Sequence, residues 1–276
     1  MTLTSAAAGG QPGPGIDVVD LTVRYEGNVA VDTVSLSAPM GRLTGLIGPN
    51  GAGKTTTFNA CSGLLRPAVG RISLFGSDVT RRGPAARARR GLGRTFQRME
   101  LFTSMTVAEN VALGREARLA GSNPLWQQMA TRGQRATVRS ATEEALDVCG
   151  ITDVADQTVE NLSTGQRRLV ELARVYAGDF RMLLLDEPSS GLDHGESEHL
   201  GRILRSLVED RGVGILLVEH DMTLVMTVCD FLYVLDFGRM VFQGTPAETQ
   251  SSAIVRAAYL GAESLMEMAD LPGGED

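Results

Sequence analysis

LTGLIGPNGAGKTTTFNACSGLL, residues 43–65, holds the pattern that decides how the rest of the chain is interpreted. LTGLIG is a short apolar run typical of a strand buried on both faces. GPNGAGKT, residues 48–55, follows it and matches G-x-x-x-x-G-K-[ST]. GKTTTFNACSGLL is a predicted helix, which ends at Gly63 and cannot continue through Pro67. A strand, a glycine-rich loop and a helix in this order predict a site for a nucleoside triphosphate, and make a chance glycine-rich turn with a lysine a poor alternative.

The residue types in this loop suit a phosphate chain. Glycines let the backbone curl so that its N–H groups face inward, where a β-carbon would crowd an anion. The helix that follows adds partial positive charge at its N-terminus. We expect Lys54 to reach the β- and γ-phosphates and the Thr55 hydroxyl to ligate Mg²⁺. The predicted nucleotide contacts of the loop are Gly48, Asn50, Gly51, Ala52, Gly53, Lys54, Thr55 and Thr56.

A second apolar strand, RMLLLDEP at 181–188, ends in two acids. Side chains at the carboxyl end of such a strand emerge into the crevice where open α/β sheets bind ligands. Asp186 is placed to hold Mg²⁺, and Glu187 to activate water as a general base. Two acids at a solvated strand end are common, so this interpretation depends on the phosphate loop upstream.

The surrounding pattern predicts an α/β fold with inserts. IDVVDLTVRY (16–25) and VSLSA (34–38) alternate as half-buried strands, and RISLFG (71–76) is a further strand. The chain from about Pro84 to Asp153 reads as a helical insert, with helices at 105–120 and 135–150 around a turn at 121–126. Strands at 181–186 and 214–220 and helices at 196–211 and 221–230 then alternate, which indicates a largely parallel sheet. Residues 231–245 form a predicted hairpin turning at 236–239.

Composition limits the class of protein. The 276 residues carry a net charge of −7, which argues against a nucleic-acid surface. No apolar run approaches the ~18 residues of a membrane span. The three cysteines are far apart and are expected to be reduced thiols in the core. Residues 1–15 lack the features of a signal peptide and are predicted to be a disordered tail, and residues 262–276 an acidic C-terminal tail.

NLSTGQRR, at 161–168 before a predicted helix, adds a second phosphate-binding pattern. A serine hydroxyl, free N–H groups and a helix dipole there would point at an anion, although Ser163 could equally be a simple N-cap. The segment closely resembles the signature motif of ABC (ATP-binding cassette) ATPases, usually LSGGQ, with Thr164 in place of the first glycine. Its position between the helical insert and the carboxylate strand strengthens that resemblance.

Other elements of the ABC family follow in order, and the resemblance extends from about residue 16 to residue 261. Tyr25 matches the aromatic residue that stacks on adenine in this family. Gln97 in RTFQ matches the Q-loop glutamine, which contacts Mg²⁺ and water. SSGLD at 189–193 resembles the D-loop, and His220 matches the switch histidine. The other two histidines, at 194 and 199, match nothing and are expected to face solvent.

The resemblance implies a P-loop NTPase core with an antiparallel β subdomain and a helical subdomain at about 98–175, all within one domain of residues 16–261. It implies ATP and Mg²⁺ as cofactors, with Glu187, His220 and Gln97 catalytic and Thr55, Gln97 and Asp186 at the metal. Two cassettes would close head to tail, so that Ser163, Gly165 and Gln166 contact the nucleotide of the opposite subunit. The helical insert would carry this motion to membrane-spanning permease subunits at the cytoplasmic face of the cell membrane.

Several stretches, among them GRTFQRMELFTSMTVAENV and LLVEHDMTLVM, resemble the ATPases of branched-chain amino acid uptake. That branch usually pairs two different cassettes with permeases and, indirectly, a solute-binding protein. Whether the second cassette here is a copy of this chain or a paralogue stays open. An export cassette and a soluble non-transport ABC ATPase remain alternatives. RRGPAARARRGLGR at 81–94 holds six arginines; we interpret it as a solvated helix near the membrane partner in preference to a nucleic-acid or lipid contact.

Overall fold

A parallel sheet forms the centre of the molecule. The computed structural model describes residues 15–95, 100–120 and 132–259. The main sheet has, in spatial order, β10 (Arg239–Gly244), β9 (Phe231–Asp236), β3 (Leu43–Ile47), β8 (Gly214–Val218), β7 (Met182–Asp186) and β6 (Leu92–Arg94). Its strand pairs are parallel except for the β9–β10 hairpin. The predicted hairpin and the strands ending at Ile47, Asp186 and Val218 are thus confirmed.

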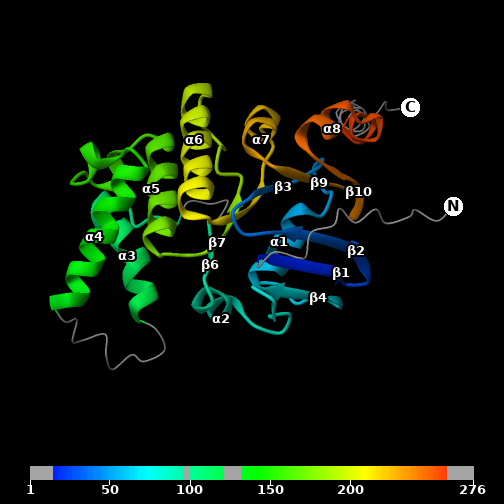
Figure 1. The fold of residues 1–276 in the computed structure, drawn as a ribbon, viewed down its shortest axis with the longest axis horizontal. Helices are drawn as coiled ribbons and strands as arrows, with labels where there is room; N and C mark the ends of the chain where they lie inside the picture. Colours follow the sequence, from blue (N-terminus) through cyan, green and yellow to red (C-terminus); the bar gives the residue numbers. More distant parts are fainter. Residues whose placement is uncertain (1–14, 96–99, 121–131, 260–276) are drawn as a thin grey trace, which may run out of the picture.

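A smaller antiparallel sheet packs beside the main one (Figure 1). Its order is β2 (Asn28–Ala38), β1 (Ile16–Tyr25), β4 (Val69–Leu74) and β5 (Ser77–Asp78). The phosphate-loop helix α1 (Lys54–Ser62) contacts β1 and β2 on one side and β7 and β8 on the other. Gly15 lies within this fold, because its carbonyl accepts a hydrogen bond from the Phe75 N–H at 2.7 Å. The architecture confirms the predicted α/β fold with an antiparallel β subdomain.

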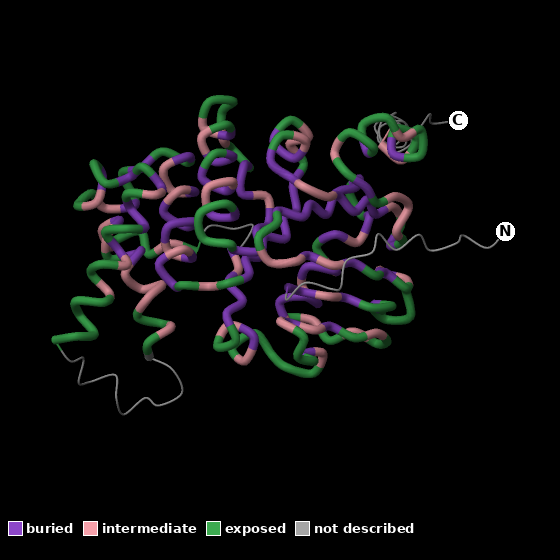
Figure 2. The backbone as a smooth tube through the Cα atoms, in the orientation of Figure 1, coloured by how far each residue is buried: buried purple, intermediate pink, exposed green. Residues whose placement is uncertain are grey.

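Alternation along the central strands divides the core into two layers. Leu183, Leu185 and Leu217 pack against the helices that cover one face of the main sheet. Leu184 and Leu216, on the opposite face, pack with α1 and the antiparallel sheet. Every residue of β3, β7 and β8 is buried, as their continuous apolar sequences predict (Figure 2). Because both faces of these strands are buried, the positions of their carboxyl ends are fixed, and the candidate site lies there.

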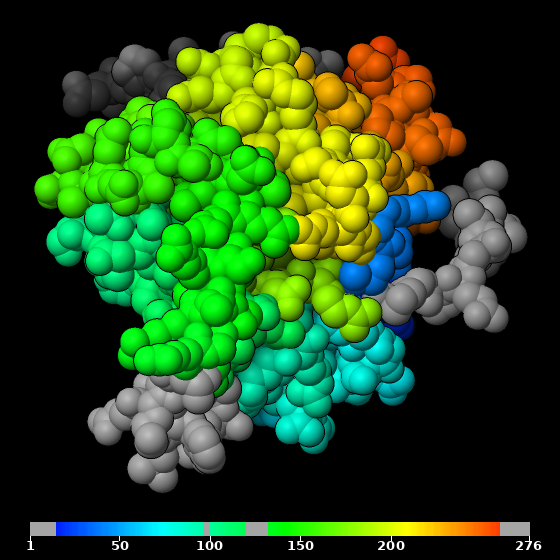
Figure 3. All heavy atoms as spheres, turned by 60° about the vertical axis from the view of Figure 1, so that its left-hand side comes forward, coloured from blue at the N-terminus to red at the C-terminus, as the bar shows by residue number. Residues whose placement is uncertain are grey.

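Helices group on one side of the main sheet as a lobe (Figures 1 and 3). The lobe consists of α3 (Val107–Ala120), α4 (Arg132–Val148) and α5 (Thr164–Ala177), with short 3₁₀ turns at Thr152–Val154 and Val159–Asn161. These three helices pack against one another. The remaining helices are α2 (Pro84–Arg89), α6 (His194–Arg211), α7 (Met222–Val228) and α8 (Pro246–Ser251). No helix in the described ranges is long and apolar enough to cross a membrane.

Two expectations for residues 81–94 were wrong. The helical insert does not begin at Pro84, because the short α2 is followed by β6, which pairs with β7 in the main sheet. The arginine-rich stretch is not simply solvated either: Arg87 is 1% exposed and the Arg94 side chain 12%. The predicted turn at 121–126, residues 1–14 of the N-terminal tail and the whole C-terminal tail lie outside the described residues.

Candidate nucleotide-binding site

The phosphate loop adopts a conformation that requires its glycines. Gly48, Gly51 and Gly53 have φ of 146°, 81° and 95°. A β-carbon on Gly48 would lie 2.1 Å from the Leu235 carbonyl oxygen, and one on Gly53 would lie 2.9 Å from that of Ala30. Gly53 caps α1 without a side-chain hydrogen bond, so the first N–H groups of the helix are left for an anion. The loop therefore has the shape and the donors that a phosphate chain needs.

Lys54 is folded back over this loop. Its ammonium donates to the carbonyl oxygens of Gly48 at 2.6 Å and Pro49 at 3.0 Å, and the residue is 5% exposed. Burial lowers the pKa of Lys54, whereas the charges of Glu187 and Asp186 act in the opposite direction. A buried cation beside free N–H groups favours a polyanionic ligand.

The predicted carboxylates and histidine meet at the end of β7. The His220 Nε2 atom lies 2.6 Å from Oε1 of Glu187. Glu187 has φ of 49°, unusual outside glycine, and its N–H donates to the Val218 carbonyl at 2.8 Å. Asp186 is 2% exposed, and burial raises its pKa while the Arg94 charge opposes that shift. The strained backbone turns Glu187 toward the loop, while Asp186 stays buried behind it.

Glu219, just before His220, organises this corner although the sequence did not single it out. Glu219 is 2% exposed. Its Oε1 accepts from the Ser189 N–H at 2.7 Å, and its Oε2 from the His220 N–H at 2.9 Å. The side chain thereby joins the segment predicted as D-loop to the histidine. An acid directly after a buried strand and next to the histidine was the signal for it.

A cavity of about 620 Å³ connects the loop with Glu187 and His220. Asn50, Gly51, Ala52, Gly53, Lys54, Thr55 and Thr56 line it, as predicted for a common site, together with Val29, Ala30 and Phe237. Phe237, in the β9–β10 turn, is 79% exposed and was not foreseen. Tyr25 ends β1 with 45% of its surface exposed and does not line this cavity. The turn that carries Phe237 is fixed to the loop, because the Gly238 N–H donates to the Ala52 carbonyl at 3.1 Å.

The signature segment forms an N-terminal cap of α5. The Ser163 hydroxyl accepts from the Gln166 N–H at 3.1 Å, and the Gln166 side chain accepts from the Ser163 N–H at 3.0 Å. Gly165 is buried against α6, where a β-carbon would lie 2.1 Å from Oε1 of Glu196. None of Ser163, Gly165 and Gln166 lines the phosphate-loop cavity. One chain therefore does not bring its two phosphate-binding patterns together.

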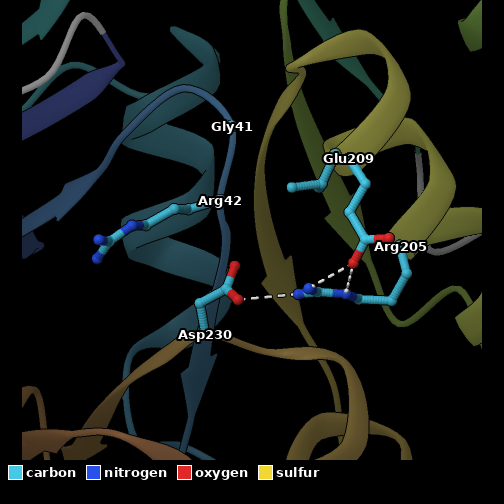
Figure 4. Close-up of a pocket in the computed structure, with 6 residues that line it drawn as sticks. Gly41, Arg42, Arg205, Glu209 and Asp230 are labelled. Atoms are coloured by element: carbon cyan, nitrogen blue, oxygen red, sulfur yellow. Dashed lines mark hydrogen bonds and ion pairs between the residues drawn. The ribbon is translucent and has the colours of Figure 1, made fainter.

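Gln97 falls outside the described residues. The remaining features lie away from this cavity. His194 is exposed as expected, but His199 is half-buried beside Gly150, contrary to the prediction. A cavity of about 470 Å³ lies at the opposite, amino-terminal edge of the main sheet. There the Arg205 guanidinium donates to Asp230 at 2.9 Å and to Glu209 at 2.7 Å (Figure 4). These three charged side chains are thus paired with one another within the fold.

The fold and this site define a class of protein. A glycine-rich loop joins a buried parallel strand to a helix, and two carboxylates end a strand of the same sheet beside it. These are the parts of a P-loop nucleoside triphosphate hydrolase.

Comparisons with known proteins give the family. Residues 31–190 match the protein family described as ABC transporter. The chain is 37% identical to the branched-chain amino acid transport ATP-binding protein BraF of Pseudomonas aeruginosa, over 90% of this chain and 98% of BraF. It is also 34% identical to the lipopolysaccharide export ATP-binding protein LptB of Haemophilus influenzae, over 88% of this chain and 95% of LptB. The chain belongs to the ABC transporter family.

A solved structure agrees with this family. The ATP-binding cassette MJ1267 of an ABC transporter, in its ADP conformation, superimposes with a TM-score of 0.78 at 28% identity, covering 89% of this chain and 98% of MJ1267. The present protein is accordingly the ATP-binding subunit of an ABC transporter, an ATPase whose hydrolysis is coupled to transport.

Proposed function

We propose that this subunit powers the import of branched-chain amino acids or a related polar solute. The observation that carries the proposal is the 37% identity to BraF across nearly the whole of both chains. Export is the second candidate, because LptB matches almost as well. A soluble non-transport role has no comparable support among these relatives.

Within one cassette, the described residues suit the following division of work. The loop N–H groups and Lys54 would hold the β- and γ-phosphates. Thr55 and Asp186 would hold Mg²⁺, which when bound supplies charge neutralisation at the phosphates. Gln97, outside the described residues, would join them as the family resemblance implies. Glu187 would accept the proton of the attacking water, and His220, at 2.6 Å, would orient that carboxylate. The adenine would lie toward Tyr25, beyond the phosphate cavity.

The second half of the site would come from another cassette, self or paralogue. Ser163, Gly165 and Gln166 lie away from their own phosphate loop, at the N-terminus of α5, where the helix dipole favours an anion. Head-to-tail closure of two cassettes would place them on the γ-phosphate. ATP would favour the closed form because it binds that form better, and hydrolysis would release it.

Coupling to transport would run through the helical lobe of α3, α4 and α5. Gln97 precedes that lobe in the chain, so a change at the γ-phosphate has a short covalent path into it. Membrane-spanning permease subunits would contact the lobe at the cytoplasmic face of the membrane, and a solute-binding protein would deliver the solute to them. The net charge of −7 argues against a nucleic-acid partner.

Purification of the tagged protein from gently solubilised native membranes, followed by mass spectrometry, tests this proposal. Permease subunits, a second cassette and a solute-binding protein encoded with them are the expected result for an importer. Recovery of permeases with a lipid-export partner would establish the exporter instead. Only soluble partners would overturn the transport role while leaving the ATPase chemistry in place.

A further inference from the structure

Arg94, the last residue of β6, contacts two elements of the nucleotide site at once, the end of β7 and the helix α1. Its Nη2 lies 3.3 Å from Oδ2 of Asp186. Its Nη1 donates to Oδ1 of Asn59 at 2.8 Å and to the Ser62 hydroxyl at 2.7 Å, both on the phosphate-loop helix α1. The guanidinium also lies 4.8 Å from the centre of the Phe58 ring. A single side chain, only 12% exposed, therefore links the carboxylate strand to the helix that carries the phosphate loop.

The backbone beside Arg94 strengthens this link. The Asp186 N–H donates to the Thr95 hydroxyl at 3.3 Å, and the Thr95 N–H donates to the Leu184 carbonyl at 3.0 Å. Arg94 and Thr95 thus hold Asp186 by its side chain and its backbone, immediately before the segment that contains Gln97. The side chains of Arg94 and Asp186 are 12% and 3% exposed, so solvent screens their interaction only weakly.

We propose that Arg94 is a positioning residue for ATP hydrolysis, which fixes the Asp186 carboxylate against α1 so that its other oxygen is presented to the cation. The inference rests on the proposed Mg²⁺ site at Asp186 and extends it by one residue. A planar guanidinium suits the task, because it bonds the carboxylate and α1 through different nitrogens while its face lies on Phe58. Residues that orient a metal ligand in this way commonly change metal affinity or activity 10–100-fold when replaced.

Arg87 offers a matched comparison. It is also a buried arginine of the same stretch, and it also contacts the end of α1, donating to the carbonyls of Ala60 at 2.7 Å and Cys61 at 2.6 Å. Its other hydrogen bonds go to the carbonyls of Arg82, Val79 and Thr80. Arg87 therefore supports the fold around α1 without bonding Asp186, and replacing it separates structural from positioning effects.

The test is nucleotide binding by the full chain, with Arg94→Met, Arg94→Lys and Arg87→Lys compared with wild type. A fluorescent ATP analogue is titrated in EDTA and again over a series of Mg²⁺ concentrations, and thermal unfolding is followed in parallel. We expect Arg94→Met to change the nucleotide Kd in EDTA less than about twofold. Mg²⁺ should lower that Kd, and the Mg²⁺ concentration that gives half of this decrease should rise by about tenfold or more in Arg94→Met. Arg94→Lys should lie between this variant and wild type. Arg87→Lys should shift the unfolding temperature and leave the Mg²⁺ dependence unchanged.

The outcomes separate this inference from the metal proposal. Wild-type Mg²⁺ dependence in Arg94→Met, or tighter Mg²⁺ binding there, would overturn the role of Arg94 and leave the metal site standing. Nucleotide binding that ignores Mg²⁺ in the wild type would overturn the metal site and this inference with it. If Arg94→Met does not fold, Arg94→Lys decides: an unchanged Mg²⁺ dependence in that variant would overturn the proposal.

Discussion

The carboxyl edge of the main sheet and the start of α5 carry the two phosphate-binding patterns, and they are built differently. At the sheet edge, Lys54, Asp186 and Glu219 are buried and bonded to several parts of the fold. At the start of α5, Ser163 is exposed, and within the described ranges its hydroxyl bonds only its own helix. The first region is assembled within the chain, whereas the second is an ordinary helix cap by its internal contacts.

This difference predicts how each region fails. Changes at the sheet edge should affect chemistry or nucleotide binding in a single chain. Changes at α5 should leave binding to that chain intact and act only where two cassettes meet.

Glu187→Gln should lower kcat by about 10²–10⁴-fold, because a general base contributes about that factor. The nucleotide Kd should change little, since the amide keeps the size of the side chain beside His220. ATPase assays and nucleotide titration of the same preparation measure both quantities. Glu198→Gln, at an exposed acid of α6 whose side chain is 60% exposed, is the control and should hydrolyse ATP normally. Undiminished turnover in Glu187→Gln would exclude Glu187 as the base.

Lys54→Ala should weaken nucleotide binding by about 10–100-fold, the equivalent of a charge-assisted hydrogen bond of about 1.5–3 kcal/mol. Lys54 is the only lysine in the sequence, which gives the test a second readout. A lysine-selective reagent should modify one side chain, and ATP should protect it. An unchanged Kd, or modification that ATP does not slow, would place the phosphates elsewhere.

Sequence alone predicted the parts of the site that follow from local pattern. The phosphate loop was recognisable because its glycines and lysine stand between a buried strand and a helix. Asp186 and Glu187 followed from the same logic, since a five-residue apolar strand ends at them. These features depend on neighbours in the chain, so a short window contains the necessary information.

The missed features depend on contacts between distant segments. The strand β6 is only three residues long and lies in an arginine-rich stretch, so its pairing with β7 gave no periodic signal. Arg87 and Arg94 were expected in solvent because arginine usually lies there; the carbonyls of α1 and the carboxylate of Asp186 offset the cost of burying them. Phe237 reaches the cavity only through the β9–β10 turn, which tertiary structure brings to the loop.

Ser163→Asp tests the second region directly. Aspartate caps helices about as well as serine, so the unfolding free energy should change by less than about 0.5 kcal/mol. A carboxylate facing the γ-phosphate of the opposite cassette should, however, lower ATPase activity by about tenfold or more in the assembled transporter, through like-charge repulsion. Nucleotide binding to the isolated chain should stay normal. Ser163→Asn, a neutral cap of the size of aspartate, is the matched control and should keep normal ATPase activity. Full ATPase activity in Ser163→Asp would mean that the signature segment only caps α5 and does not contact the nucleotide of the opposite cassette.

The smallest expected effect concerns an exposed pair beside the first region. Arg239 bonds Asp32 at 2.8 Å, which joins β2 to the turn that carries Phe237. Hydrogen bonds from Thr33 and Arg239 lower the pKa of Asp32 from its ordinary value of 3.8. Because the folded pKa is the lower one, the pair stabilises the fold above about pH 4, and this contribution is lost as the pH falls through the folded pKa.

Asp32→Asn should therefore lower the unfolding temperature slightly and equally between pH 5 and 7, and the difference from wild type should shrink only below about pH 4. Asp153→Asn, at another exposed acid, serves as the control. The nucleotide Kd should change less than about twofold. Water screens this exposed pair, so the pair fixes the β9–β10 turn more weakly than buried groups fix the phosphate loop. A large loss of nucleotide binding in Asp32→Asn would contradict this. It would mean that the exposed Asp32–Arg239 pair, and not only the buried Lys54, Asp186 and Glu219, sets the geometry of the phosphate site.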